Sequence, residues 1–86
     1  MRELEKTLKA LANRRRLAIV KLLKKQGEKS VGDIAHEINL SFKSTSKHLG
    51  VLGAVDIVDR EQRSLQMFYR LAKNQKPAAK HIISLL

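Results

Sequence analysis

The sequence predicts a small, mainly α-helical fold that carries one β-hairpin near its C-terminal end. Three observations lead to this fold class. Apolar residues recur at helical spacing in five segments, which is the pattern of amphipathic helices. Gly27, Asn39 and Pro77 mark where helices end or begin. Two runs rich in β-branched and aromatic residues, 55–60 and 65–71, flank a short polar stretch, as in a hairpin.

Length and charge narrow the class of function. The 86 residues suffice for one domain, 1–86, and a chain this short is marginally stable alone, so oligomerisation is expected. Lys plus Arg total 18 and Asp plus Glu total 8, a formal charge of +10, which attracts polyanions such as nucleic acid. No apolar run approaches the roughly 20 residues that span a bilayer. The absence of cysteine excludes thiolate metal ligands and favours a reducing compartment.

The first and last helices, about 2–12 and 77–86, are the expected dimerisation elements. The first has a narrow stripe of leucines at i, i+4 and i+7, which suits packing against a partner. The last is strongly apolar for a terminal segment, although its own core could absorb it fully. The predicted interface residues are Leu4, Leu8, Leu11, Ile82, Ile83 and Leu86.

The second helix begins after Asn13, a favoured N-cap, and ends near Gly27. Its first turn holds Arg14, Arg15 and Arg16, where three cations oppose the helix dipole. One explanation is a phosphate clamp assisted by the terminal amides. The alternative is that one arginine pairs internally with an acidic side chain while the others are solvated.

Residues 30–54 are predicted to form a helix-turn-helix. Ser30 caps its first helix, Asn39 forms the turn, Leu40 points inward and Ser41 caps the second helix. At 100° per residue the second helix has an apolar side and a small, cationic side. In such a unit the second helix enters the major groove of DNA, so this side is a candidate base-reading face, or else an ordinary solvated face. The predicted DNA contacts are Ser41, Lys43, Ser44, Ser46 and Lys47.

The hairpin, about residues 55–71, has the polar connection 61–64 at its expected tip. A tip of this kind places Arg60, Gln62 or Arg63 in a minor groove or on phosphate, or leaves them solvated. A helix-turn-helix followed by a charged hairpin is the layout of a winged helix. The expected order of elements is therefore α-α-α-α-β-β-α.

Three stretches together resemble the ArsR-type winged-helix repressors over roughly residues 8–72. They are KALANRRRLAIVKLL, LSFKSTSKHLGVLGAVDIV and MFYRLA. By position, Asn13 and Arg16 match the family's Asp and Arg before the second helix, and His48 joins the recognition-helix positions. The resemblance implies a homodimeric prokaryotic regulator that binds a palindromic operator. Two features depart from it: SVGDIAHEI lacks the cysteine pair of the metal sensors, and Asp56 stands where the family usually has Gly.

The sequence therefore predicts a homodimeric, sequence-specific regulator of transcription, a repressor, that binds double-stranded DNA. It is expected to be cytoplasmic and nucleoid-associated, with no metal site and no cofactor. Lysines scattered beyond the helix-turn-helix favour a nonspecific nucleoid or RNA-binding protein as the alternative. A winged helix whose apolar last helix binds another protein is the third possibility. An enzyme is not expected, because there is no Cys nucleophile, no phosphate-binding Gly loop and no cluster of carboxylates.

Overall fold

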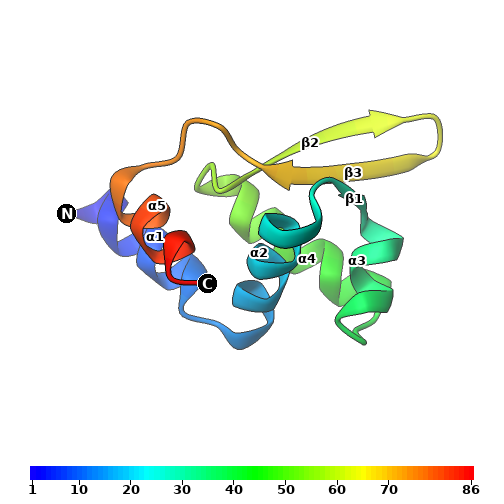
Figure 1. Ribbon diagram of the computed structural model, residues 1–86, viewed down its shortest axis with the longest axis horizontal. Coiled ribbons are helices and arrows are strands. Elements are labelled where there is room, and N and C mark those ends of the chain that lie inside the picture. The colour runs from blue at the N-terminus through cyan, green and yellow to red at the C-terminus, as the bar shows by residue number, and fades with distance from the viewer.

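The computed structural model describes all 86 residues and contains five helices and three strands. The α1 and α5 helices lie side by side at one end of the fold, and the β2–β3 hairpin extends beyond the other end (Figure 1). The elements are, in order, α1 (Arg2–Leu11), α2 (Arg14–Gln26), β1 (Lys29–Ser30), α3 (Val31–Glu37), α4 (Phe42–Ala54), β2 (Val58–Arg63), β3 (Gln66–Leu71) and α5 (Pro77–Ser84).

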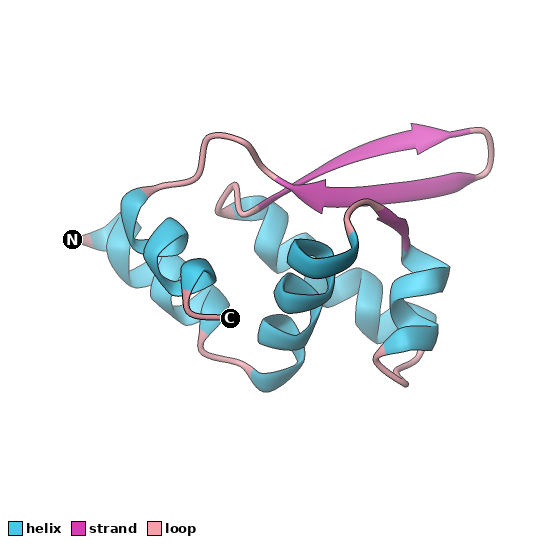
Figure 2. Ribbon diagram, viewed as in Figure 1, coloured by secondary structure: helices cyan, strands magenta, loops and turns pink.

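The strands form one antiparallel sheet in the order β1-β3-β2, which lies along one side of the helices (Figure 2). The hairpin register runs from Val58 opposite Leu71 to Arg63 opposite Gln66. The expected order of helices and hairpin is confirmed, but β1 is an additional strand that pairs with the middle of β3. Two residues are too few to show the alternation that identifies a strand in a sequence.

All three predicted helix caps form. The side chains of Asn13, Ser30 and Ser41 each accept a hydrogen bond from a backbone N–H two or three residues further on, at 2.9–3.1 Å. These bonds satisfy amide groups that have no partner within the helix. The α2, α3 and α4 helices therefore begin where the local sequence predicts.

The α3 and α4 helices end in the same way. Asn39 and Asp56 adopt the left-handed conformation, with φ of 56° and 60°. The next residues, Leu40 and Ile57, each donate their backbone N–H to the carbonyl five residues back, at 3.0 Å. This is the Schellman arrangement, which fixes the direction of the chain at both ends of α4. It confirms the predicted turn at Asn39, and it shows that Asp56 makes the turn usually made by glycine.

The hairpin turn is two residues, Ser64 and Leu65, and not the stretch 61–64. Ser64 takes the left-handed conformation that such a tight turn requires, with φ of 56°. Glu61 and Arg63 consequently lie within β2. Residues 55–57, expected in the first strand, instead terminate α4, so the hairpin is shifted toward the C-terminus relative to the prediction.

The core lies between α2, α3, α4 and the base of the hairpin. Ile19, Ile34, Leu49 and Leu52 are completely buried. Leu11 and Ile83 join the same cluster, with only 3% and 6% of their surfaces exposed. Contrary to the prediction, neither residue can offer its side chain to a second copy, because the core of the chain already covers both.

Candidate nucleic-acid interface

The exposed side of α4 is the face that its helical period predicts. Thr45, Leu49 and Leu52 are buried against the rest of the fold, whereas the residues on the opposite side are open to solvent. We call this opposite side the reading face. It consists of Lys43, Ser46, Lys47, Gly50 and Ala54.

The two lysines of the reading face form no ion pair with an acidic residue. None of the six ion pairs in the structure includes Lys43 or Lys47. They lie one turn apart on the same side of the helix, where like charges repel. An anion bound at this face would relieve that repulsion, so the face is suited to phosphates and to the electronegative edges of bases.

The predicted serines differ in how accessible their hydroxyl groups are to a ligand. Ser46 is exposed in the middle of the reading face, whereas Ser44 is half-buried at its margin. The Ser41 hydroxyl accepts the hydrogen bond that caps α4, at 3.1 Å. Ser46 is therefore the hydroxyl best placed to reach a ligand, and Ser41 serves first to fix the start of the helix.

Arg60 of the hairpin lies close to the reading face. It lines a depression of about 350 Å³ together with Gly50, Gly53 and Ala54 of α4, and Asp56 and Asp59 line the same depression. Gln62 follows two residues later on the same face of β2, because side chains alternate along a strand. The structure therefore brings Arg60 to the C-terminal part of the reading face, beside Gly50 and Ala54.

Arg63 lies on the other face of the hairpin and is already engaged. Its guanidinium contacts Glu28 at 2.8 Å and Glu61 at 3.1 Å, and it lies 4.7 Å from the centre of the Phe68 ring. Arg70 contacts the same two glutamates at 3.0 and 3.3 Å. The Arg63 hydrogen bond and charge, with those of Arg70, hold the pKa of the Glu61 carboxyl below its usual range. Two arginines and two glutamates neutralise each other, so Arg63 offers DNA little free charge.

Arg16 points into the fold instead of outward. It donates to the backbone carbonyls of Lys9 and Ala10 at the end of α1, and its Nη1 lies 3.2 Å from Nδ1 of His48 on α4. For Arg16 the structure shows the internal pairing that was the alternative to a phosphate clamp. Its partners, however, are backbone carbonyls and a histidine instead of an acidic side chain. Arg16 thus joins three helices, and each of its three guanidinium nitrogens is engaged within the fold, which makes it less available to phosphate than Arg14 and Arg15.

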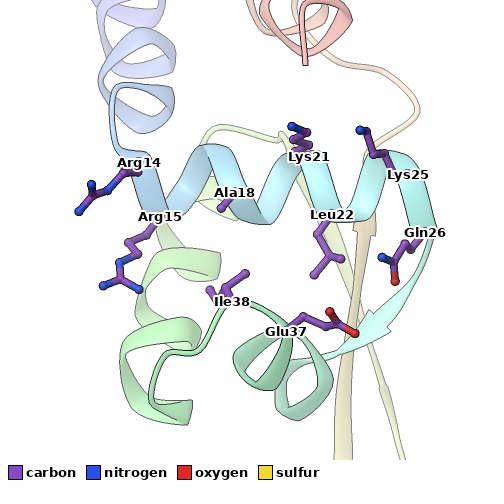
Figure 3. A pocket seen from close by; sticks show the side chains of 9 residues that line it. All are labelled: Arg14, Arg15, Ala18, Lys21, Leu22, Lys25, Gln26, Glu37 and Ile38. Atoms are coloured by element: carbon purple, nitrogen blue, oxygen red, sulfur yellow. The ribbon is translucent and has the colours of Figure 1, made fainter.

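Arg14 and Arg15 remain exposed at the start of α2. They stand at one end of a groove of about 550 Å³ between α2 and α3, shown in Figure 3, with Lys21 and Lys25 further along α2. None of these four cations takes part in an ion pair in the structure. The only acidic residue lining the groove is Glu37, so its surface carries an excess of positive charge.

The α1 helix presents an apolar surface to solvent. Leu4 and Leu8 are each 43% exposed and line a groove of about 280 Å³ with Met1 and Ala12. Of the predicted interface residues on α5, Ile82 is half-buried. Leu86, just beyond the end of α5, is also half-buried, and the neighbouring Leu85 is 72% exposed.

Two polar contacts hold α5 in place beside this surface. Lys76 pairs with Glu3 at 3.0 Å, which ties the start of α5 to α1. Lys24 of α2 donates to the carbonyl of Ile83 at 2.9 Å, near the negative end of the α5 dipole. The terminal helices are therefore anchored to the fold while they leave an apolar strip uncovered.

No three side chains among His, Cys, Asp and Glu come together where they could hold a metal ion. None of the helices combines the length and the apolar character needed to cross a membrane.

Two proteins of known role are similar in sequence. The chain is 40% identical over 68 residues to the Biofilm growth-associated repressor of Agrobacterium fabrum, covering 79% of this chain and 57% of that protein. It is 35% identical over 71 residues to the Transcriptional activator HlyU of Vibrio cholerae, covering 83% and 65%. The chain thus spans less than two thirds of either relative.

Solved structures share the fold. Reduced HlyU from Vibrio cholerae superposes with a TM-score of 0.82 at 33% identity, covering 98% of this chain and 84% of that one. The homodimeric winged helix-turn-helix DNA-binding domain of a possible ArsR-family regulator from Mycobacterium bovis gives 0.81 at 30% identity, covering 96% and 73%. These likenesses confirm the predicted winged helix-turn-helix.

The family model for the bacterial regulatory protein, arsR family, matches residues 13–60, from the cap of α2 into β2. This segment is more than half of the chain and includes both helices of the helix-turn-helix. As the residues of the recognition helix suggest, the chain belongs to the arsR family of bacterial regulatory proteins, a family of regulators and not of enzymes.

Proposed function

We propose that this protein is a homodimeric, sequence-specific DNA-binding regulator of transcription that represses its target genes. The observation that carries the proposal is the reading face of α4, where Lys43 and Lys47 are exposed and free of acidic partners. The fold presents this face on the second helix of a helix-turn-helix, the helix that enters the major groove in such proteins.

In the proposed complex the reading face supplies the base contacts. Lysine can donate to the O6 and N7 acceptors of guanine or to a phosphate, and Ser46 can serve either a base edge or the backbone. Arg60 reaches the DNA beside α4 from the hairpin, with Gln62 further toward the tip. Arg14 and Arg15 are proposed to contact phosphates next to the site, and Arg63 contributes less because Glu28 and Glu61 neutralise it.

The proposed dimer forms through α1 and the C-terminal end of the chain. Leu4, Leu8 and Leu85 expose apolar surface to water, which costs free energy, and a second copy of the chain would bury that surface. A twofold axis at this surface gives two α4 helices and hence a palindromic operator, with half-sites about one helical turn apart. Sedimentation of the pure chain tests the dimer: a stable monomer with this strip exposed would instead favour a different protein partner.

Repression is the proposed direction of control, because the relative with 40% identity is a repressor. The relative with 35% identity is an activator. A reporter gene placed behind the operator therefore has to decide between repression and activation. Repression needs only that the dimer occupy promoter DNA, without a cofactor or a metal. The place of action would be the nucleoid in the cytoplasm, which imaging of a fluorescent fusion checks.

A salt titration of binding to duplex DNA tests the proposal. Each phosphate neutralised should contribute about −0.9 to the slope of log affinity against log salt, so several contacts give a steep line. A flat line contradicts DNA binding through this basic surface. Competition with RNA and with unrelated duplexes separates the alternatives, because equal competition by every polyanion indicates a nonspecific nucleic-acid binder.

A further inference from the structure

Phe42, the first residue of α4, is an aromatic side chain that the fold does not bury. Its surface is 62% exposed, and it is one of the few large apolar residues in that state. Leaving a phenylalanine in water forgoes most of the stabilisation that its burial yields. The contribution of Phe42 to the core is therefore small, and its exposure calls for a different explanation.

One side of Phe42 borders a small cleft at the surface. The side chain lines a small cleft of about 110 Å³ with Val31 and Gly32 at the start of α3. Leu65 and Met67 of the hairpin line the same cleft. A side chain that has neighbours on one side loses less conformational freedom on binding than one that is surrounded by water.

Phe42 also lies along the margin of the reading face. Phe42, Ser46 and Gly50 are separated by four residues each, so they form one row along α4, and all three are exposed. The row borders the two free lysines. Because the N-terminal residues of a recognition helix are the ones that reach base edges, Phe42 is placed at the depth where bases are read.

The major groove presents one apolar group, the C5 methyl group of thymine, and aromatic side chains are among those that contact it. We propose that Phe42 contacts a thymine methyl group in each operator half-site and so determines specificity for an A·T pair there. The inference rests on the proposed DNA-binding function, and it adds the base that this residue selects.

Replacement of thymine by deoxyuridine tests the contact, because it removes the methyl group and keeps every hydrogen-bonding group. The operator is first obtained by selection from random duplexes, and each thymine is then replaced singly. Wild-type protein should lose about fourfold in affinity at one position per half-site, the cost of leaving one methyl group unburied. Phe42→Ala should bind the thymine and deoxyuridine forms of that site equally. Phe42→Leu should keep part of the preference.

Val51→Ala is the matched control. Val51 is 37% exposed and apolar, but it lies about two and a half turns along the helix from Phe42, on the opposite side and further from the N-terminus of α4. This variant should discriminate between the two bases as strongly as wild type does. Thermal unfolding of each variant verifies that it is folded. We expect all of them to fold, because both side chains are exposed and contribute little to the core.

The possible results distinguish a failure of this inference from a failure of the proposed DNA-binding function. If selection enriches no sequence, the proposed function and this inference both fail. If an operator is found but no thymine methyl affects binding, the inference alone is wrong. It is also wrong if Phe42→Ala still loses affinity at the same deoxyuridine, or if Phe42 instead binds a protein and its loss leaves DNA selection unchanged.

Discussion

The Nη1 atom of Arg16 lies 3.2 Å from the Nδ1 atom of His48, which links the start of α2 to the recognition helix. The same guanidinium donates to the carbonyls of Lys9 and Ala10 at the end of α1. One side chain therefore fixes the proposed dimer helix relative to the helix proposed to read DNA. The spacing of two reading faces in a dimer depends on such a connection.

Removal of this connection should destabilise the fold. Arg16→Ala leaves partly buried acceptors without donors, and the free energy of unfolding should fall by about 1–3 kcal/mol in urea denaturation. Arg15→Ala is the control, because its exposed side chain makes no hydrogen bond, and its effect should stay within about 0.5 kcal/mol. Equal effects of the two substitutions would show that the Arg16 contacts do not contribute to stability.

Stability should also depend on pH through His48. Burial lowers the pKa of the His48 imidazole, and the charges of Arg16, Arg15 and Lys47 lower it further. In the unfolded chain a histidine has a pKa of about 6.5, so between that value and the lower folded pKa the unfolded state binds more protons. Stability should therefore be full above about pH 7 and decline as the pH falls through 6.5.

Urea denaturation at several pH values measures this dependence, and His48→Gln should remove part of the decline. His81→Gln is the control, since His81 is exposed on α5 and its ring makes no hydrogen bond. If His48→Gln and wild type decline in parallel, another group causes the pH dependence.

Lys47 and Arg63 should differ in their effects on DNA binding, although both are exposed cations. Lys47 has no acidic partner, so Lys47→Ala should reduce operator affinity by about 1–3 kcal/mol and relax base preference if Lys47 meets a base. Arg63→Ala should have a smaller effect that is similar for all sequences, because Glu28 and Glu61 already neutralise it. Fluorescence anisotropy on matched and mismatched duplexes measures both. A larger and sequence-dependent loss for Arg63→Ala would contradict this assignment.

Substitution of Gly50 should have opposite effects on the stability of the fold and on its affinity for DNA. A Cβ atom added there meets nothing within 4 Å, and alanine favours a helix over glycine by about 1 kcal/mol. Gly50→Ala should thus stabilise the fold but weaken DNA binding if the reading face approaches the duplex closely. Gly53→Ala is the control, because its added Cβ meets Val58 at 4.0 Å, an ordinary contact within the fold. Unchanged DNA affinity in Gly50→Ala would mean that the duplex does not approach at this point.

Local chemistry made much of the fold predictable from the sequence. Asn13, Ser30 and Ser41 cap helices because their short side chains reach the backbone of the next turn, which requires no knowledge of the tertiary structure. The apolar and polar sides of α4 follow from its period alone. These features define the helix-turn-helix and its reading face.

Contacts between distant segments were not predictable in the same way. Glu28 lies 35 residues before Arg63, and nothing in the local sequence indicates that the two side chains form an ion pair. The sequence places the hairpin turn too early because neither Ser64 nor Leu65 is Gly or Asn, the residues that usually mark a tight turn. Phe42 did carry a signal, as an aromatic residue in the first turn of a helix whose outer side is otherwise small and polar.

Selection of bound duplexes from a random DNA pool tests the central claim most directly. The purified protein should enrich one palindromic sequence, with half-sites whose centres lie about 10 base pairs apart or a multiple of that spacing. Lys47→Ala should enrich a less defined sequence at the positions that Lys47 reads. A pool that stays random after repeated rounds, at salt concentrations where the protein still retains DNA, would contradict sequence-specific recognition by α4.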